Sequence, residues 1–268
     1  MAELRRGVMK RDRLIPALVT SMLAAAVIAA GACAEINTDP NFAAAIAIDT
    51  LPFPSIVAND SLRDSLGVAR PLRGSVFNIE GDVLSSIAVT FRTPDSGAVV
   101  DSTTGYIVAD TARSTPLRVI AVAGTLQSAP DTLYIVPAPD TVIADVTTDS
   151  LLYSLTDTTA NLSNPLTLQL MHRVPASDRL PVRSYLVSYQ ITYPSDPLLA
   201  QLVTRDGARK STVDTTDATG TSQRRIRLRP LSLTSVNDSV VVIATVRYRG
   251  TTVAGAPVRF VLQVKPHP

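Results

Sequence analysis

The sequence VVVIATVRYR, at residues 240–249, decides the fold class of this chain. It joins β-branched and other apolar residues in a run of strand length, and Gly250 follows it directly. β-branched residues favour extended backbone over helix, and a short apolar run that ends at a turn residue is typical of a buried strand. We therefore expect residues 240–249 to form a core strand.

The neighbouring sequence has the same character. Residues 182–193, VRSYLVSYQITY, predict a long strand with Tyr185, Val187, Tyr189, Ile191 and Tyr193 on one face. That row of tyrosines has two interpretations, a binding face for a glycan or protein and, more commonly, core packing with the hydroxyls at the rim. Further strands are expected at residues 166–171, 198–203, 224–229 and 257–264.

The first half of the chain repeats this pattern. Residues 117–123, LRVIAVA, are its clearest core strand, and we expect Ile120 to belong to the core. Further strands are expected at residues 42–48, 56–58, 83–92, 98–101, 106–109 and 133–136. Short strands at this spacing, separated by Gly and Pro, favour a β-sandwich, and no stretch shows a helical period with caps.

Composition supports a folded, strand-rich chain. Apolar residues make up 46% of the 268 positions, but aromatic residues make up only 4% and Trp is absent. The core must therefore consist of Val, Ile, Leu and Ala. The first 33 residues carry five of the 25 basic and two of the 23 acidic residues, so the remainder has a net charge of −1. No basic field remains that would attract nucleic acid.

Residues 137–140, Pro-Ala-Pro-Asp, mark the expected domain boundary. Two prolines within three residues stiffen the chain and stop a strand. We expect one β-sandwich at residues 42–137 and a second at residues 138–268, with a junction that is stiff and needs no metal.

The N-terminus has the layout of an export signal. Residues 1–13 are net positive, residues 14–32 are uncharged, and small residues gather just before Cys33. We expect a signal segment at residues 1–33 and a polar tether at residues 34–41.

The sequence Ala30-Gly31-Ala32-Cys33 resembles the lipobox of bacterial lipoproteins. Ala30 departs from the larger apolar residue that this family prefers. The resemblance implies cleavage before Cys33 and lipidation of its sulfur, and more than one acyl chain would anchor the protein stably. Two alternatives are that Cys33 stands beside an ordinary cleavage site, and that residues 14–32 remain as a transmembrane anchor.

Residues 86–137 resemble a bacterial Ig-like domain of the Big family, group 2. The motifs that carry the resemblance are Val89–Phe91, Gly105–Ala109 and Val119–Ala121, with Phe91 in place of the usual Trp. The second half is similar to the invasin/intimin-like group at residues 164–167, 216–220 and 242–244. The resemblance implies an all-β protein of two tandem immunoglobulin-like β-sandwiches after an N-terminal signal and lipid-anchor segment.

Residues for catalysis are scarce. The chain has two histidines, His172 and His267, and the second is the penultimate residue, so a His-dependent triad or multi-His metal site has little material. The adjacent pair Lys210-Ser211 lies in a polar stretch, which favours a loop over a Ser–Lys dyad. We expect no enzyme activity, no catalytic residue and no cofactor.

Two sets of charged residues, one of aspartates and one of arginines, could bind a ligand. Asp140, Asp145, Asp149 and Asp157 follow the predicted boundary, where carboxylates can bind Ca²⁺. Their spacing matches no calcium loop, so we interpret them as solvated turn and edge residues and predict no metal site. The arginines of residues 224–229 are expected on the solvent face of their strand, although they could pair with an acidic partner.

These features predict a non-enzymatic, envelope-anchored protein for adhesion, spacing or assembly at the bacterial surface. The alternative is a periplasmic carbohydrate-binding protein or hydrolase accessory built on the same sandwiches. The expected partners are a membrane, reached through the lipid anchor, and an unknown envelope protein or glycan, with no nucleic acid. Because Ala34 follows Cys33, the resemblance to Gram-negative lipoproteins implies the outer membrane. The sequence does not identify binding residues.

Overall fold

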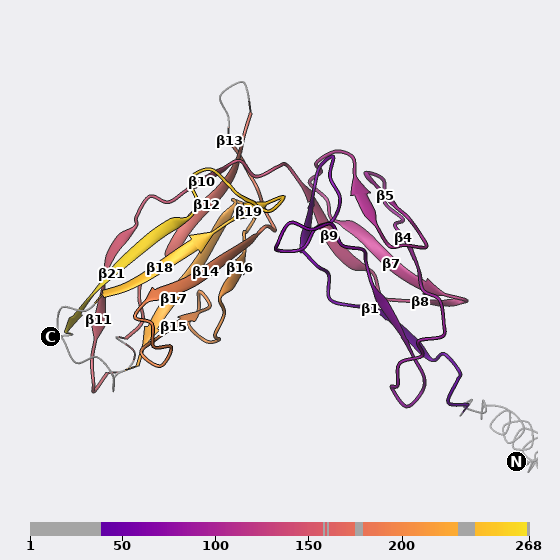
Figure 1. The fold of residues 1–268 in the computed structure, drawn as a ribbon, viewed down its shortest axis with the longest axis horizontal. Coiled ribbons are helices and arrows are strands. Elements are labelled where there is room, and N and C mark those ends of the chain that lie inside the picture. Colours follow the sequence, from indigo (N-terminus) through magenta and orange to yellow (C-terminus); the bar gives the residue numbers. More distant parts are fainter. Residues whose placement is uncertain (1–38, 158, 160, 175–178, 230–238, 267–268) are drawn as a thin grey trace, which may run out of the picture. The chain divides into compact units, whose positions relative to one another are not determined.

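The computed structural model describes residues 39–157, 159, 161–174, 179–229 and 239–266, and all secondary structure in these residues is β (Figure 1). Residues 43–268 form one compact unit. Its strands fall into two groups, because no sheet contains strands from both sides of residues 137–140.

The second group forms two five-stranded sheets and a short hairpin. Its strands are β10 (Thr141–Ile143), β11 (Thr148–Tyr153), β12 (Leu166–Arg173), β13 (Arg179–Pro181), β14 (Leu186–Tyr193), β15 (Ala200–Val203), β16 (Val213–Thr215), β17 (Thr221–Leu228), β18 (Ser239–Thr245), β19 (Arg247–Tyr248), β20 (Thr251–Thr252) and β21 (Val258–Pro266). One sheet has the order β10-β12-β17-β15, with β13 beside β12, and the other has the order β11-β21-β18-β14-β16.

This strand order is that of an immunoglobulin sandwich. Immunoglobulin domains place strands A, B, E and D in one sheet and strands C, F and G in the other. With the strands lettered along the chain, β10-β12-β17-β15 has the first order and β21-β18-β14 has the second. The leading strand switches sheets, since β10 pairs with β12 whereas β11 runs parallel to β21.

The first group is a smaller version of the same plan. Its strands are β1 (Ala45–Ile48), β2 (Ser55–Val57), β3 (Gly74–Phe77), β4 (Thr90–Arg92), β5 (Ala98–Val100), β6 (Ile107–Ala109), β7 (Leu117–Ala123), β8 (Leu126–Gln127) and β9 (Asp131–Val136). The sheet β2-β9-β7-β4 again carries a leading strand parallel to its last one, and the pairs β1-β3 and β5-β6 complete the group.

Alternation of apolar residues forms both cores. In β7, Leu117, Val119, Ala121 and Ala123 are buried, whereas the residues between them are partly or fully exposed. Strands β17 and β21 alternate in the same way. Because successive side chains of a strand point to opposite faces, each strand contributes one buried row. The predicted all-β fold of immunoglobulin-like sandwiches is confirmed for the described residues.

Several sequence predictions need correction. Residues 83–92 form a strand only at Thr90–Arg92; before it, Val83 makes an isolated bridge to Phe77, and residues 85–87 form a turn and a bend. Ile120 lies on the partly exposed face of β7, so it is not a core residue. Strands β3, β10 and β11 were not predicted, because they are short or lie at sheet edges with little apolar alternation. The domain bounds 42–137 and 138–268 remain predictions.

Candidate functional site

The most elaborate polar cluster in the described chain joins the two groups of strands. Its centre is Asp60, whose side chain is only 4% exposed. Arg63 donates to both carboxylate oxygens of Asp60, over 2.9 Å from Nε and 2.8 Å from NH2. The Ser61 amide donates from the same group of strands. From the other group, Arg249 Nε donates over 2.9 Å and the Tyr248 hydroxyl over 3.1 Å.

Tight turns place both halves of this cluster. Asn59 follows β2 with a φ of 58°, a left-handed conformation that Asn tolerates better than most residues. On the opposite side, Arg249 and Gly250 connect β19 to β20 and have φ values of 50° and 79°. Two positive φ values in a two-residue hairpin loop are typical of a type I′ turn. This turn brings the Arg249 guanidinium to Asp60.

The pKa of Asp60 reflects these contacts. Burial alone raises the pKa of Asp60. Hydrogen bonds from Arg63, Arg249 and the Ser61 amide, together with the charge of Arg63, lower this pKa by more than burial raises it. The net result is a pKa well below the ordinary value of 3.8. Asp60 therefore stays ionised at neutral pH, and its oxygens are occupied by donors. Such a carboxylate is suited to holding two segments together and poorly suited to accepting a proton in catalysis.

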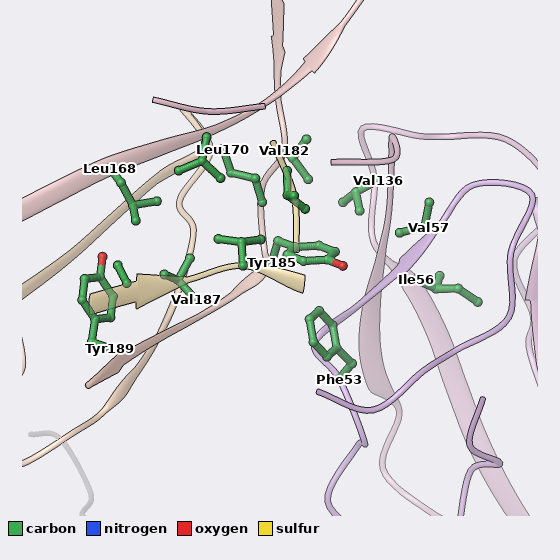
Figure 2. Packing of buried hydrophobic residues seen from close by; sticks show 14 of the residues in the cluster. Phe53, Ile56, Val57, Val136, Leu168, Leu170, Val182, Tyr185, Val187 and Tyr189 are labelled. Carbon is green, nitrogen blue, oxygen red and sulfur yellow. The ribbon is translucent and has the colours of Figure 1, made fainter. Parts of the chain in front are cut away.

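Apolar contacts extend the junction beside this cluster. Phe53 and Tyr185 meet edge to face, with ring centroids 4.9 Å apart and an interplanar angle of 63°. Figure 2 shows the two rings between Ile56, Val57 and Val136 of the first group and the buried residues of the second. The Tyr185 hydroxyl donates to the Arg247 carbonyl over 2.8 Å, and burial raises the pKa of Tyr185. Aromatic pairs of this geometry add stability beyond their buried area.

Two further contacts reinforce the junction. The Arg183 guanidinium lies 4.5 Å from the centre of the Tyr134 ring and also donates to the carbonyls of Arg113 and Ser114. Gly67, with a φ of 83°, lies so close to the β19–β20 turn that a Cβ on it would stand 2.1 Å from the Gly250 nitrogen. Contact this close requires glycine.

The four aspartates after the predicted boundary are not brought together. Asp140 accepts from the Arg173 amide and lies 3.3 Å from His172 Nδ1. Asp149 accepts from the Ser150 amide and from Asn164, and Asp157 accepts from Thr159. Asp145 lies between β10 and β11. Within the described residues, no three His, Cys, Asp or Glu side chains are grouped to hold a metal ion. That the junction needs no metal stays a prediction.

The remaining sequence candidates have local roles. His172 lies near the end of β12, where its Nδ1 is 2.8 Å from the Ala138 carbonyl. Ser211 Oγ donates to the Val213 carbonyl, while Lys210 is exposed beside it. Cys33, the predicted lipidation site, lies outside the described residues, and His267 does as well.

The tyrosine row of β14 belongs mainly to the core. Tyr185, which lies just before β14, and Val187 and Tyr189 within it are buried (Figure 2). Tyr193, at the end of β14, is 48% exposed. The Tyr189 hydroxyl lies 2.9 Å from Ser222 Oγ, which in turn donates to Asp214. This geometry favours the packing interpretation over a binding face.

Arg224 contradicts the expectation that the arginines of β17 all face solvent. It lies on the inward row of β17 and is only 7% exposed, and its guanidinium forms a 2.7 Å ion pair with Asp214 of β16. Because β16 and β17 belong to different sheets, this pair joins the two sheets of the second sandwich. Arg225 and Arg227 lie on the other, partly exposed row.

Sequence reasoning missed the Asp60 cluster. Asp60 is separated in the sequence from Tyr248 and Arg249 by 188 and 189 positions. None of these residues belongs to a known motif. One local signal was present, since Arg249-Gly250 between two short polar–apolar segments predicts a two-residue hairpin. That signal identifies the turn but not what the turn contacts.

No protein-family model matches the sequence, and no curated protein matches it. Among the described residues, none forms a helix long and apolar enough to span a membrane.

Solved structures with similar folds share 9–14% identity with this chain. Domains 4 and 5 of the S-layer protein SbsC match 82% of this chain and 96% of their own length, with 13% identity and a TM-score of 0.27. The Yersinia pseudotuberculosis adhesin InvE matches 82% of this chain and 58% of its own, with 12% identity and a TM-score of 0.33. The bacterial integrin-binding protein invasin matches 83% and 39%, with 14% identity and a TM-score of 0.27.

This chain therefore spans less than two thirds of either adhesin structure. A β-glycosidase from Bacteroides vulgatus is also among the similar structures. Structural similarity at TM-scores this low does not support an inference about function. The fold assignment rests on the strand order and pairing described above.

Proposed function

We propose that this chain is a non-enzymatic module of the bacterial cell envelope, anchored at Cys33, that serves adhesion, spacing or assembly. The observation that carries the proposal is the junction around Asp60. A spacer or display module needs successive sandwiches that keep a defined orientation under load. Here the two groups of strands are joined by a buried carboxylate, an aromatic pair and a close glycine contact.

The charge arrangement supports this role. Asp60 is ionised and buried, so separating the two groups would leave it without the donors from Tyr248 and Arg249. Each hydrogen bond to a charged group contributes about 1.5–3 kcal/mol to stability, so losing these two opposes separation. The hydrogen bonds of Asp60 with Tyr248 and Arg249 therefore oppose bending at the junction, and both sides of these bonds come from this chain.

The proposed anchor follows from the sequence. Residues 1–13 are basic, residues 14–32 are apolar, and the only cysteine of the chain stands at position 33. A diacylglyceryl group on Cys33 would hold the folded part to a membrane, with residues 34–41 as the tether. By the same reasoning we place the protein at the outer membrane or cell surface of a Gram-negative bacterium.

Cell fractionation tests the anchor. Cells expressing the wild-type chain and the variants Cys33→Ala and Cys33→Ser are labelled with an alkyne fatty acid, and the membrane and soluble fractions are compared. We expect label and membrane retention in the wild type and loss of both in the two variants. Equal membrane retention by the variants would favour a helical anchor at residues 14–32 and contradict lipidation.

Protease treatment of intact cells tests surface display. Cleavage of the protein without cell lysis is expected if it faces the exterior, and a periplasmic maltose-binding protein is the control. Glycan binding by the purified protein, or hydrolysis of a glycan, would instead favour the alternative carbohydrate-related role.

A further inference from the structure

A groove of about 470 Å³ opens on one side of the second sandwich, between β14 and β15. This volume lies within the range of small-ligand and peptide pockets. Ile191 and Tyr189 of β14 line one side, and Ala200 and Leu202 of β15 line the other. The loop that contains Pro194 and Pro197 borders the groove, as does the segment from Lys210 to Thr212.

The β14 side of the groove presents an open sheet edge. Strand β16 pairs with β14 only at Leu186–Ser188, and the Tyr189 amide then donates to the Thr212 carbonyl over 2.7 Å. Beyond this point β14 continues to Tyr193 with β18 on its other edge. Backbone groups two residues apart point the same way along a strand. The N–H and C=O of Ile191 therefore point to the same open edge as the Tyr189 amide.

The β15 side presents a second open edge. Strand β15 ends its sheet, with β17 on one edge and, among the described residues, only a bridge from Val203 to Lys210 on the other. On the other edge, the Leu202 carbonyl accepts from the Ser211 amide over 3.1 Å. By the same alternation, the backbone groups of Ala200 point to this edge. The groove therefore has apolar walls, and within the part of the chain that the structure describes the backbone groups of Ile191 on one side and Ala200 on the other have no partner.

One charge lies at the groove. Lys210 lines it and is exposed, and the ion pairs formed among the described residues do not include Lys210. The residues that line the groove include no acid. A ligand that carries a negative charge beside an apolar stretch would complement this surface.

We propose that the groove binds an extended peptide segment as an added strand, with apolar side chains at alternate positions and an acidic residue beside Lys210. A peptide backbone satisfies the open edges, and alternate side chains reach the apolar walls, which is how strand addition combines affinity with specificity. A fatty acid would fill the walls but leave the edge groups unpaired. The proposal is independent of the anchor, so its failure leaves the function proposed above unaffected.

Fluorescence anisotropy with a defined peptide library tests the proposal on the purified full-length chain. The probes are eight-residue peptides with Val, Ile, Leu or Phe at alternate positions, Ser or Thr between them, and one Asp. We expect members to bind and their Asn counterparts to bind several-fold more weakly. N-methylation of the backbone amides at alternate residues should abolish binding, because it removes the ladder donors.

Matched lysine variants locate the site. Lys210→Ala should weaken binding of the Asp peptides about fivefold while leaving the Asn peptides unchanged. Lys265→Ala, at the exposed end of β21, should change neither. Amide hydrogen exchange at Ile191 and Ala200 should be fast in the free chain and slow with peptide bound. Absence of binding by every library member at 1 mM, or equal binding of N-methylated peptides, would overturn the proposal.

Discussion

Asp60 shows how one residue can hold two parts of a chain together. Its carboxylate is almost fully buried, yet it accepts from Arg63 and Ser61 on one side and from Tyr248 and Arg249 on the other. Hydrogen bonds to charged groups are stronger than neutral ones. The residue therefore contributes to stability as the hub of several contacts.

We predict that Asp60→Asn lowers the free energy of unfolding by about 1–3 kcal/mol. The amide keeps the shape of the side chain but loses the charge, and its NH₂ group would face donors. Urea unfolding, followed by circular dichroism, measures the difference.

Asp110→Asn is the matched control, because Asp110 is exposed. It should change the free energy of unfolding by less than about 0.5 kcal/mol. Equal effects of the two substitutions would show that the Asp60 cluster contributes nothing specific.

At the scale of the element, β7 illustrates how a strand divides its residues between core and surface. Leu117 and Val119 are fully buried, whereas Ile120, between the buried Val119 and Ala121, is partly exposed. Hydrophobicity alone does not distinguish these neighbours. What distinguishes them is whether the residue occupies an odd or an even position along the strand, because alternate side chains point to opposite faces.

We predict that Leu117→Ala costs roughly 2–5 kcal/mol, as is usual for removing a buried leucine side chain. Ile120→Ala should cost clearly less, since part of its surface already contacts water. Thermal unfolding of the two variants under identical conditions gives the comparison. A larger loss for Ile120→Ala would mean that the register of β7 differs from that described.

At the scale of the whole molecule, the junction depends on close contact between segments far apart in sequence. Gly67 meets the backbone at Gly250, and Phe53 meets Tyr185. These contacts exist only when both groups of strands are folded.

We predict that Gly67→Ala destabilises the protein more than Gly81→Ala does. Both glycines have positive φ, 83° and 89°, so both alanines incur backbone strain of roughly 1–2 kcal/mol. Only the alanine at position 67 would also meet the Gly250 backbone, because nothing lies within 4 Å of a Cβ at position 81.

Differential scanning calorimetry distinguishes these effects. Gly67→Ala should lower the melting temperature further than Gly81→Ala and separate the unfolding of the two groups of strands. Identical traces for the two variants would contradict the close contact.

We also predict that acid weakens the junction. The folded pKa of Asp60 lies below its unfolded value, so the stability it contributes is complete above that unfolded value, about 3.9, and is lost as the pH falls further. Asp95 contributes in the same direction, because hydrogen bonds from Arg118 lower its pKa to about 2. Unfolding measured from pH 6 to pH 3 should show a smaller loss for Asp60→Asn than for the wild type. Parallel curves would exclude Asp60 as a source of the acid sensitivity.

Much of the fold was predictable because it depends on local patterns. The strands predicted at residues 117–123, 166–171 and 240–249 are apolar and β-branched, so their sequences favour extended backbone wherever they pack. The last of these was predicted too long, because β18 ends at Thr245 and Arg247–Tyr248 form the separate strand β19. Short edge strands such as β10 and β11 carry little of this signal, and their pairing partners supply most of their stability. Residues 84–89 show the opposite case, since this largely apolar segment forms no strand.

The sequence by itself determined the fold class, the main core strands, and the expectation of export with an anchor at Cys33. Tertiary structure decided that Arg224 faces inward, that Ile120 faces outward, and that Asp60 meets Arg249 across the junction. The physical reason is the range of the interactions. Strand propensity and alternation act over a few residues, whereas a salt bridge or a ring contact depends on where distant strands bring their side chains.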